Sequence, residues 1–362
     1  MSSLYIHIPF CDHICTYCDF CKVFYNEQWA DRYLEALQFE LEQKQINEQF
    51  DTIYIGGGTP SSLNERQLER LLRLIKPYSQ TVLEYSIEVN PESMNLAKME
   101  LLVKYGITRL SIGAQSFNDQ ILSEIGRYHK AKDVYNLIKL ANEYGIHDIN
   151  VDLMYGLPQQ SLAHVLSDIK IIQSLPVSHI SVYSLILEDH TQLKNINYKP
   201  LDDEEDAIWY DAIVQALENA GYKHYEISNF YKDKPSLHNL VYWHYEEYYG
   251  VGVSAHSLLN QHRYENTRSL NRYFEHQYIQ TDVLLDENDQ LFETIMMGLR
   301  LKEGLDIQKL NDKFHINFKE KYKSVIDKYV LLKCIEVGDS YLKPTHIGFK
   351  YLNNILVDFM DD

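Results

Sequence analysis

The feature that most constrains this chain is a short loop near its start, which holds four of its five cysteines. Cys11, Cys15, Cys18 and Cys21 follow an apolar run that reads as a β-strand. Structural zinc normally uses two cysteine pairs separated by a dozen or more residues. An iron–sulfur cluster can be reached by thiolates only two or three residues apart along one loop. The spacing therefore favours an iron–sulfur cluster, and it leaves Cys21 as a fourth cluster ligand, part of a zinc site, or neither.

Composition limits the kinds of partner and compartment that we expect. The chain has 362 residues, enough for one large core or two moderate ones, and a net charge of -18, which argues against a nucleic-acid partner. No apolar run is long enough to span a bilayer, and no signal-peptide pattern precedes the first strand. We therefore expect a cytoplasmic protein whose clustered cysteines hold metal rather than disulfides. The isolated Cys334 lies among apolar residues and is expected to be a packed core thiol.

Strand and helix signals alternate six times along the first two thirds of the chain. Such alternation implies parallel strands with right-handed crossovers, in either an open doubly wound sheet or a barrel. No Gly-x-Gly-x-x-Gly follows the first strand, so a dinucleotide fold is disfavoured and a partial (β/α)6 barrel, with its site at the carboxyl ends of the strands, is favoured. After the run at Tyr5, the expected strands are 52–55, 85–89, 108–112, 147–153 and 179–185, and the expected helices are 27–45, one opened by Ser62-x-x-Glu65, 95–105, 131–144, 162–174 and 202–220.

Polar residues interrupt these strands where apolar side chains would be expected. Glu88 lies in the third strand, Gln115 and Ser116 follow the fourth, and Asp152 lies in the fifth. A carboxylate within a buried strand costs several kcal/mol unless it is hydrogen-bonded. A bound ligand or a neighbouring loop amide would meet that need, and three such positions on successive strands favour the ligand.

The spacing Cys11-x3-Cys15-x2-Cys18, with an aromatic residue before the last cysteine, resembles the cluster loop of the radical S-adenosylmethionine (SAM) family. In that family three thiolates hold a [4Fe-4S] cluster, and SAM binds its fourth iron. The resemblance implies Cys11, Cys15 and Cys18 as ligands. A glycine run one βα unit after the loop contacts the methionine amino group of SAM in this family, although a glycine run alone is more often a plain turn. In this chain that run implies Gly57, Gly58 and Thr59.

Further positions resemble the anaerobic coproporphyrinogen III oxidase (HemN) branch of the same family. The resemblance implies that Glu88 and Asp152 bond ribose hydroxyls or polar groups of SAM. It also implies that Arg127 pairs with the SAM carboxylate and that Gln115 faces the adenosyl side. Tyr5 and Tyr17 would pack beside the cluster. The matching stretch runs from Tyr5 to about His256.

A second motif, His238-Asn-Leu-Val-Tyr242-Trp243, lies beyond the sixth strand. An imidazole close to flat aromatic rings offers an axial nitrogen for a porphyrin, although a histidine beside aromatic residues is more often a core residue. The six residues resemble the His-Asn-x-x-Tyr-Trp motif of a heme-chaperone subfamily related to the oxidase. That resemblance implies heme binding at His238, Tyr242 and Trp243. The small residues in 250–256 suit a loop pressed against a cofactor or against the barrel.

Two features favour the chaperone over the oxidase. The oxidase carries an N-terminal extension before its cluster strand, whereas only four residues precede Tyr5 here, and it has another cysteine where this chain has Phe20. The expected function is transfer of heme to an acceptor protein, which could be membrane-associated and met only transiently. The cofactors expected are a [4Fe-4S] cluster, exchangeable SAM and heme. The alternative is an oxygen-independent coproporphyrinogen III oxidase type of radical enzyme.

The last part of the chain reads as a smaller, mainly helical, winged-helix-like domain. We expect helices at 291–301, 307–314, 318–329 and 345–359, with a hairpin of 335–337 and 341–343 around Gly338-Asp339. The net charge argues against a nucleic-acid role of this element, so we expect a cap or a docking surface. The expected division is a core of 1–235, a connecting segment of 236–285 and a C-terminal domain of 286–362.

Overall fold

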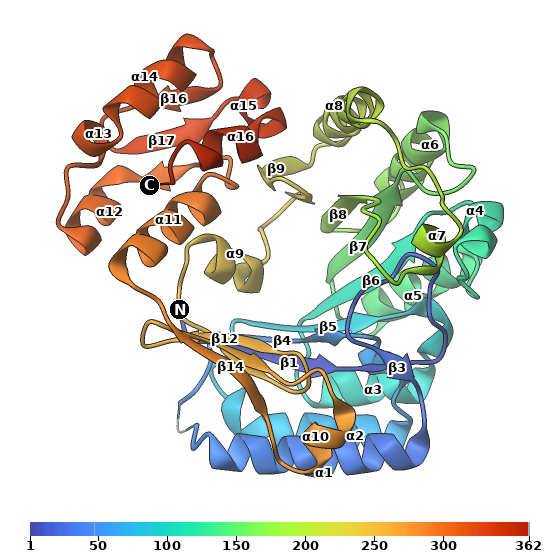
Figure 1. Cartoon of the computed structure of the whole chain (residues 1–362). Helices are drawn as coiled ribbons and strands as arrows, with labels where there is room; N and C mark the ends of the chain where they lie inside the picture. Colours follow the sequence, from blue (N-terminus) through green and yellow to red (C-terminus); the bar gives the residue numbers. More distant parts are fainter. Residues whose placement is uncertain (47, 361–362) are drawn as a thin grey trace.

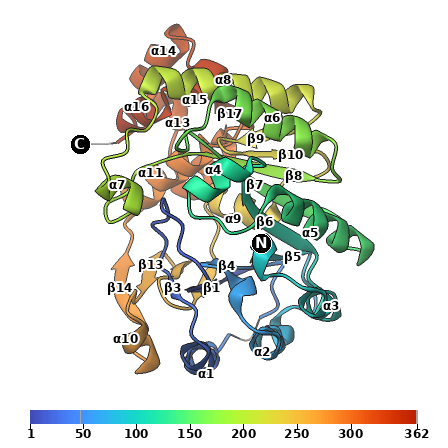
Figure 2. The ribbon, with the colours of Figure 1, turned by 90° about the vertical axis from the view of Figure 1, so that its right-hand side faces the viewer.

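The computed structural model describes residues 1–46 and 48–360. In this part of the chain, a curved nine-stranded sheet has the order β11-β1-β4-β5-β6-β7-β8-β10-β9 (Figure 1, Figure 2). Six successive strands of it run parallel, so a crossover joins each strand to the next. The fold class predicted from the sequence, a partial (β/α)6 barrel, is confirmed. The six strands are β1 (Ser3–Ile8), β4 (Thr52–Gly57), β5 (Glu84–Val89), β6 (Arg109–Gln115), β7 (Asp148–Tyr155) and β8 (His179–Ser184).

Helices lie along the outside of this curved sheet (Figure 1). Their N-termini are fixed by side chains that accept the first free backbone N–H groups. Asn26 accepts from the Trp29 N–H at 3.1 Å, and Asn95 accepts from the Lys98 N–H at 2.9 Å. The longer outer helices are α1 (Glu27–Gln43), α2 (Glu65–Ile75), α3 (Leu96–Lys104), α5 (Ala131–Glu143), α6 (Leu162–Gln173) and α8 (Asp203–Asn219), and α4 (Asp119–Glu124) and α7 (Gln192–Asn195) are short.

The start of α2 differs from the sequence prediction. Ser62 was expected to open a capping box with Glu65, but Pro60–Ser62 forms a 3₁₀ turn and the Ser62 hydroxyl accepts the Asp12 N–H at 3.2 Å. Asn64 caps the helix instead, because its side chain accepts the Gln67 N–H at 2.9 Å while the Gln67 side chain accepts the Asn64 N–H. The predicted box was therefore wrong, and the actual one begins two residues later.

The segment 250–256 presses against the first strand of the barrel. Gly252 has φ +99°, and a Cβ there would lie 2.6 Å from the His7 carbonyl oxygen, so only glycine fits. Its N–H donates to the fully buried Glu40 at 2.8 Å. Glu40 also accepts from Asn266 at 2.7 Å and from the Tyr273 hydroxyl at 2.6 Å. Of the two roles considered for these small residues, packing against the barrel is the one observed.

The chain between the barrel and the C-terminal part contributes to the main sheet and adds a second one. β11 (Tyr249–Val251) pairs in parallel with β1, whereas β10 (Asn229–Tyr231) and β9 (Lys223–Glu226) extend the other edge with antiparallel pairing. This connection also carries α9 (Leu237–Trp243), α10 (Leu270–Phe274) and a three-stranded sheet of β12 (His256–Leu259), β13 (His262–Asn266) and β14 (Ile279–Leu284).

The C-terminal part has its own apolar core. Leu291, Phe318 and Phe359 belong to it, and so does the buried Cys334, as expected. The predicted hairpin is present as β16 and β17, and β15 adds a third strand that was not predicted. The expected last helix is divided at Tyr351 into two short helices. The elements are α11 (Glu287–Gly298), β15 (Leu305–Asp306), α12 (Ile307–Phe314), α13 (Phe318–Lys321), α14 (Lys323–Leu331), β16 (Ile335–Val337), β17 (Tyr341–Pro344), α15 (His346–Lys350) and α16 (Leu352–Val357).

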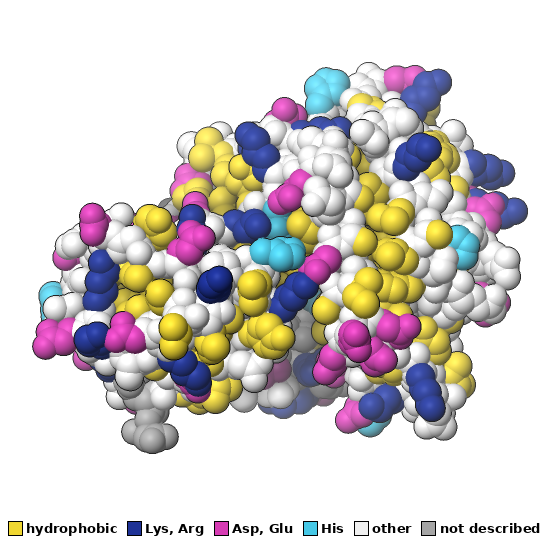
Figure 3. Space-filling model, turned by 90° about the horizontal axis from the view of Figure 1, so that it is seen from above, with side chains coloured by type: hydrophobic (Ala, Val, Ile, Leu, Met, Phe, Trp, Pro, Cys, Tyr) yellow, Lys and Arg dark blue, Asp and Glu magenta, His cyan; other side chains and the backbone are white. Residues whose placement is uncertain are grey.

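Two expectations from the sequence concern nucleic-acid binding and membrane spans. Seen from above, basic and acidic side chains are interspersed over the C-terminal part and the barrel rather than gathered into one basic patch (Figure 3). Phosphate-backbone binding depends on a basic patch, and this view of the surface shows none. Among the residues that the structure describes, no helix has both the length and the apolar character needed to cross a bilayer.

Candidate functional site

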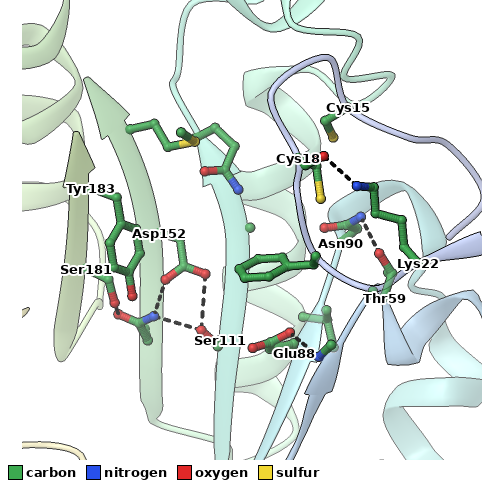
Figure 4. Close-up of a pocket in the computed structure, with 18 of the residues that line it drawn as sticks. Cys15, Cys18, Lys22, Thr59, Glu88, Asn90, Ser111, Asp152, Ser181 and Tyr183 are labelled. Atoms are coloured by element: carbon green, nitrogen blue, oxygen red, sulfur yellow. Dashed lines mark hydrogen bonds between the residues drawn. The ribbon is translucent and has the colours of Figure 1, made fainter. Parts of the chain in front are cut away.

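A cavity of about 540 Å³ lies inside the curve of the sheet. Side chains point into it from every second position of successive strands, as the two-residue period of a strand requires. The cross-strand register brings Tyr5 beside Tyr54, Glu88 beside Ser111 and Asp152 beside Ser181. Figure 4 shows the cysteine loop on one side of the cavity, with Asp152, Ser181 and Tyr183 on the other. The predicted residues that line it are Tyr5, Cys11, Cys15, Tyr17, Cys18, Gly57, Gly58, Thr59, Glu88, Gln115, Arg127, Asp152, His238 and Tyr242.

The cysteine loop is held at its base by a short parallel pairing of β2 (Phe10–Cys11) with β3 (Val23–Phe24). A turn from Cys15 to Cys18 closes its tip, where the Cys18 N–H donates to the Cys15 carbonyl at 3.3 Å. The glycine run lies directly against it, since a Cβ on Gly58 would be 3.0 Å from the Cys11 sulfur. Three thiols line one cavity, beside a backbone that only glycine allows so close, and they could serve as the ligands of a [4Fe-4S] cluster with one open iron. Among the described residues, no three Cys, His, Asp or Glu side chains are close enough to hold a single metal ion.

Cys21 lies apart from the other three cysteines of the loop. It does not line the cavity, and its sulfur donates to the Arg268 carbonyl oxygen at 3.7 Å. Its own carbonyl oxygen interacts with His7 Nε2 at 2.9 Å, which fixes the backbone at the end of the loop. This position favours the three-ligand arrangement over a fourth cysteine ligand.

Arg127 extends from the segment after α4 to the cysteine loop. Its guanidinium donates to the Asn90 side chain at 2.8 Å and to the Tyr17 hydroxyl at 3.2 Å. Its Nε is buried and has no hydrogen-bond partner among the described residues. A buried donor without a partner costs free energy, so an anionic group such as a carboxylate that reached the guanidinium would be stabilised there.

Two carboxyl groups face the middle of the cavity. Glu88 accepts from the Tyr54 hydroxyl at 2.8 Å and from the Gly57 N–H at 3.0 Å. Burial raises the pKa of Glu88 to about 7, and the nearby Asp152 adds to that rise. Burial also raises the pKa of Asp152, which accepts from Asn150 at 2.7 Å and from Ser111 at 3.2 Å. The Gly57 N–H is a loop amide of the kind considered from the sequence, so it accounts in part for the buried carboxyl group of Glu88. Both carboxyl groups nevertheless line the cavity.

Gln115 ends β6 in a conformation that few residues adopt. Its φ is +65°, and the pairing of β6 with β7 shifts its register between Gly113 and Gln115. Strained backbone of this kind persists where the surrounding structure holds it, often at ligand sites. Gln115 lines the cavity together with Ser111 and Gly113, which precede it at every second position of β6.

His238 lies on α9 at the wall of the same cavity and is 2% exposed. The buried Glu84 fixes the start of this helix by accepting the N–H groups of Leu237 at 2.8 Å and His238 at 3.1 Å. The two imidazole nitrogens are both engaged, Nδ1 with Thr52 Oγ1 at 2.8 Å and Nε2 with the Tyr242 hydroxyl at 2.8 Å. Burial lowers the pKa of His238 to about 3, so the ring is neutral and can act as a metal ligand.

Trp243 is the one residue of the predicted site set that does not line the cavity. It lies at the other end of α9, where the Arg300 guanidinium is 5.6 Å from its ring centroid. Arg300 follows α11, so this contact joins the helix of the heme motif to the C-terminal part of the chain. The motif therefore has two sides, with His238 and Tyr242 facing the cavity and Trp243 facing the C-terminal core.

Several cavity residues were not identified from the sequence. Tyr54 lies between Tyr5 and His238 in a layer of rings, with centroid distances of 6.2 Å and 5.3 Å. Others are inward-facing polar residues on the last two parallel strands, and the signal that could have found them is alternation at every second position. These residues are Asn150 on β7 and His179, Ser181 and Tyr183 on β8.

Family models match two parts of the chain. Residues 5–172 match the model described as the radical SAM superfamily, and residues 285–349 match the HemN C-terminal domain. The first match contains the cysteine loop and the carboxyl residues of the cavity. The second lies within the part of the chain that has the separate core.

Similar proteins of known name cover the whole chain. The chain is 37% identical to the heme chaperone HemW of Bacillus subtilis over 380 residues, which cover 100% of both chains. It is 36% identical to HemW of Lactococcus lactis, covering 100% of this chain and 98% of that one. It is also 33% identical to HemW of Escherichia coli, covering 83% of each.

Among solved structures, the chain resembles coproporphyrinogen III oxidase (HemN) of Escherichia coli, a radical SAM enzyme. The TM-score is 0.86, and the match covers 99% of this chain and 90% of the other at 24% sequence identity. At that identity the likeness establishes the fold, including the position of the C-terminal part beside the barrel.

Proposed function

Because the chain belongs to the HemW family of heme chaperones within the radical SAM superfamily, we propose that it binds heme and passes it to an acceptor protein. The observation that carries this proposal is the position of His238, a neutral imidazole at the wall of a cavity that also contains the cysteine loop. A neutral imidazole is a common axial ligand of heme iron.

We propose that Cys11, Cys15 and Cys18 hold a [4Fe-4S] cluster. Support comes from three thiols that line one cavity and from Gly57 and Gly58, which let the backbone approach the loop closely. When bound, such a cluster supplies an open iron for SAM and can donate one electron. The residues of this chain hold the loop in place through the β2–β3 pairing and keep Cys21 outside the cavity.

Exchangeable SAM is proposed to bind between the cysteine loop and β7. The free Nε–H of Arg127 suits its carboxylate, and the carboxylates of Glu88 and Asp152 suit its ribose hydroxyls. Gln115 would face the adenosyl side. Tyr5 and Tyr17 pack around the site, and Thr59 contributes a hydroxyl that lies 3.4 Å from the Cys11 sulfur.

A site that gives heme away must also be stable without it. His238 meets this requirement, because both of its ring nitrogens have hydrogen-bond partners within the protein. Heme binding would replace the Tyr242 hydroxyl at Nε2, and release would restore that hydrogen bond. Trp243 is proposed to support this exchange by anchoring α9 to Arg300, rather than by touching the ring.

The test is a heme titration followed by transfer. We expect His238→Ala to weaken heme binding at least tenfold in a Soret titration of the cluster-loaded protein. His244→Ala is the matched control, because His244 follows α9 but pairs with Glu303 on the surface and does not line the cavity. Heme-loaded wild type should then transfer its heme to a heme-free globin, which is followed as a change in the Soret band. Equal titrations for wild type and His238→Ala would refute the assignment.

The oxidase activity is kept as a second candidate because the fold matches that of HemN so closely. Anaerobic incubation of the cluster-loaded protein with SAM, a reductant and coproporphyrinogen III distinguishes the two. We expect no decarboxylated product. Product in excess over protein would assign the chain to the oxidase function.

A further inference from the structure

Three segments of the chain meet at the place proposed for the SAM carboxylate. A Cβ on Gly113 would lie 2.9 Å from the Asn90 side-chain oxygen and 3.2 Å from both Arg127 Nη2 and Gln115 Nε2. The Arg127 guanidinium also donates to Asn90 at 2.8 Å. Figure 4 shows Asn90 beside the cysteine loop, where it donates to Thr59 at 3.1 Å. These side chains come from β6, from the turn after β5 and from the segment after α4, so their relative positions depend on how the three segments are joined.

One imidazole, that of His129, contacts two of these segments and belongs to the third, two positions after the arginine. Its Nε2 lies 3.2 Å from the carbonyl oxygen of Ala114, which directly precedes Gln115. Its Nδ1 lies 3.1 Å from a carboxylate oxygen of Glu92, two residues after Asn90. The His129 side chain is fully buried. A single side chain therefore joins all three segments.

Both partners of the His129 ring can only accept hydrogen bonds. A carbonyl oxygen has no proton to give, and the Ala114 carbonyl also accepts the Ser116 N–H at 2.8 Å. Burial alone would raise the pKa of Glu92, but the hydrogen bond from His129 and the nearby Arg127 lower it, so the carboxyl group is ionised. An imidazole that meets an acceptor at each nitrogen satisfies both only when each nitrogen carries a proton. The geometry therefore describes an imidazolium.

The charges beside this imidazolium favour an anionic ligand. Glu92 is its hydrogen-bonded counter-ion, and Arg127 is a second positive charge beside the same carboxylate. Among these three side chains one positive charge is left over, next to the buried Arg127 Nε that has no partner among the described residues. A carboxylate from SAM would supply the missing negative charge.

The contact with the Ala114 carbonyl affects the strained residue that follows it. The peptide unit between Ala114 and Gln115 is planar, so holding its carbonyl oxygen also holds the orientation of the Gln115 N–H. Gln115 has φ +65°, a conformation that residues other than glycine adopt at a cost in free energy. The hydrogen bond from His129 is one of the contacts that keep Gln115 in this conformation.

We propose that His129 is a positioning residue of the SAM site, held as an imidazolium that fastens to one another the three segments whose side chains converge over Gly113. The proposal rests on the proposed function, because it takes the SAM carboxylate to bind at Arg127. His129 itself does not line the cavity. Its effect on SAM therefore passes through the residues that it holds.

The first measurement is the protonation of the ring in the wild type without SAM, by NMR of protein with nitrogen-labelled histidine. Both ring nitrogens of His129 should give signals typical of protonated nitrogen at neutral pH, and their loss in His129→Gln assigns them. Glu92→Gln should remove one of the two protons, because the amide can donate to Nδ1 while Nε2–H still donates to Ala114. A wild-type ring with one unprotonated nitrogen, or an unchanged ring in Glu92→Gln, would overturn the proposal.

The second measurement is the SAM affinity of cluster-loaded variants, by anaerobic equilibrium dialysis without reductant. His129→Gln has donors at one end only and turns its amide oxygen towards an acceptor, so SAM should bind roughly tenfold more weakly at unchanged iron and sulfide content. Adding Glu92→Gln should restore most of that affinity, because two amides hydrogen-bond where an amide oxygen and a carboxylate repel. His147→Gln is the matched control, since His147 contacts Asn142 and does not line the cavity.

These results separate failure of the inference from failure of the proposed function. If the wild type binds no SAM, the proposed function fails and the positioning role fails with it, even when the spectrum shows the imidazolium. If the wild type binds SAM and His129→Gln binds it equally tightly, or if the double variant binds no better than His129→Gln, the positioning role alone is wrong. If His129→Gln does not fold, the spectra of the wild type and of Glu92→Gln still support or overturn the imidazolium.

Discussion

The two ends of the cavity differ in how complete they are without a ligand. At the cysteine end, three free thiols line the cavity, and the buried Arg127 Nε has no hydrogen-bond partner among the described residues. At the α9 end, His238 is 2% exposed and both of its nitrogens are hydrogen-bonded. Unpaired polar groups are costly, whereas paired ones are stable. The cysteine end of the cavity therefore needs a bound group, whereas the α9 end can gain and lose one.

The largest expected effect is at the cysteine end. Cys11→Ala, Cys15→Ala or Cys18→Ala should each abolish the [4Fe-4S] spectrum after anaerobic reconstitution, because each removes a thiolate that lines the cavity. Cys21→Ala is the matched control within the loop, and Cys334→Ala is the control in the C-terminal core. Iron and sulfide content measures the result. Loss of the cluster in Cys21→Ala would show that Cys21 is needed for the cluster and that the three-ligand assignment is wrong.

A second prediction concerns the hydrogen bond between Tyr242 and His238 at the α9 end. Tyr242→Phe keeps the ring but removes the hydroxyl that covers His238 Nε2. Heme should then bind more tightly by roughly fivefold, since a competing hydrogen bond is worth about 1 kcal/mol. Tyr248→Phe is the control, because its ring packs on Tyr242 with centroids 4.7 Å apart, whereas the partners of the imidazole nitrogens are Thr52 and Tyr242. Weaker heme binding in Tyr242→Phe would mean that the hydroxyl assists the ligand instead of competing with it.

The two ends of the cavity should also differ in how their ligand affinity depends on pH. The pKa of Glu88 is raised to about 7, so its accepting form is lost as the pH falls through 7, and SAM affinity should fall by up to about tenfold per unit below that point. The pKa of His238 is lowered to about 3, so its protonation should leave heme affinity unchanged between pH 6 and 8. Glu88→Gln should bind SAM weakly at every pH. A SAM affinity that is flat from pH 6 to 8 in the wild type would contradict this.

The same shift has a consequence for stability. A carboxyl group that binds its proton more tightly in the folded state makes the free protein less stable as the pH rises from the ordinary value of 4.5 to about 7. Glu88→Gln should remove that part of the pH dependence of unfolding.

The smallest expected effect is at the mouth of the cavity. Phe20 and Ile186 line the cavity and yet are 65% and 70% exposed, so they lie at its opening. Phe20→Ala and Ile186→Ala should each weaken heme binding about two- to threefold, because they remove apolar contact area from the opening. Phe24→Ala and Ile196→Ala are matched controls, since those side chains are 63% and 71% exposed but do not line the cavity. Equal effects in both pairs would show that the mouth makes no specific contact.

The fold could be predicted because local signals repeat. Each of the six parallel strands is a short β-rich run followed by a helix, and chain order equals sheet order from β1 to β8. The short strands β9 to β14 were not predicted, because three to six residues carry little pattern and their pairing depends on distant partners such as β1. The division of the last helix at Tyr351 likewise depends on packing in the C-terminal core.

Part of the site could be predicted because some of its residues are unusual at their positions in the sequence. Glu88 and Asp152 stand out because carboxylates are rare in buried strands, and the cysteine spacing is specific. Tyr54 could not be found in this way, because a tyrosine in a strand is ordinary until the fold stacks it on His238. The position of Trp243 also required the structure, since residues five apart on a short helix can face different neighbours.

The most direct measurement of the central claim is an anomalous difference map at the iron edge, from crystals of cluster-loaded protein soaked with heme in the absence of SAM. The account predicts a strong multi-iron peak enclosed by Cys11, Cys15 and Cys18 and a separate single-iron peak at bonding distance from His238 Nε2, inside the same cavity. A single-iron peak elsewhere on the molecule, with the hydrogen bond from Tyr242 to His238 intact, would contradict it.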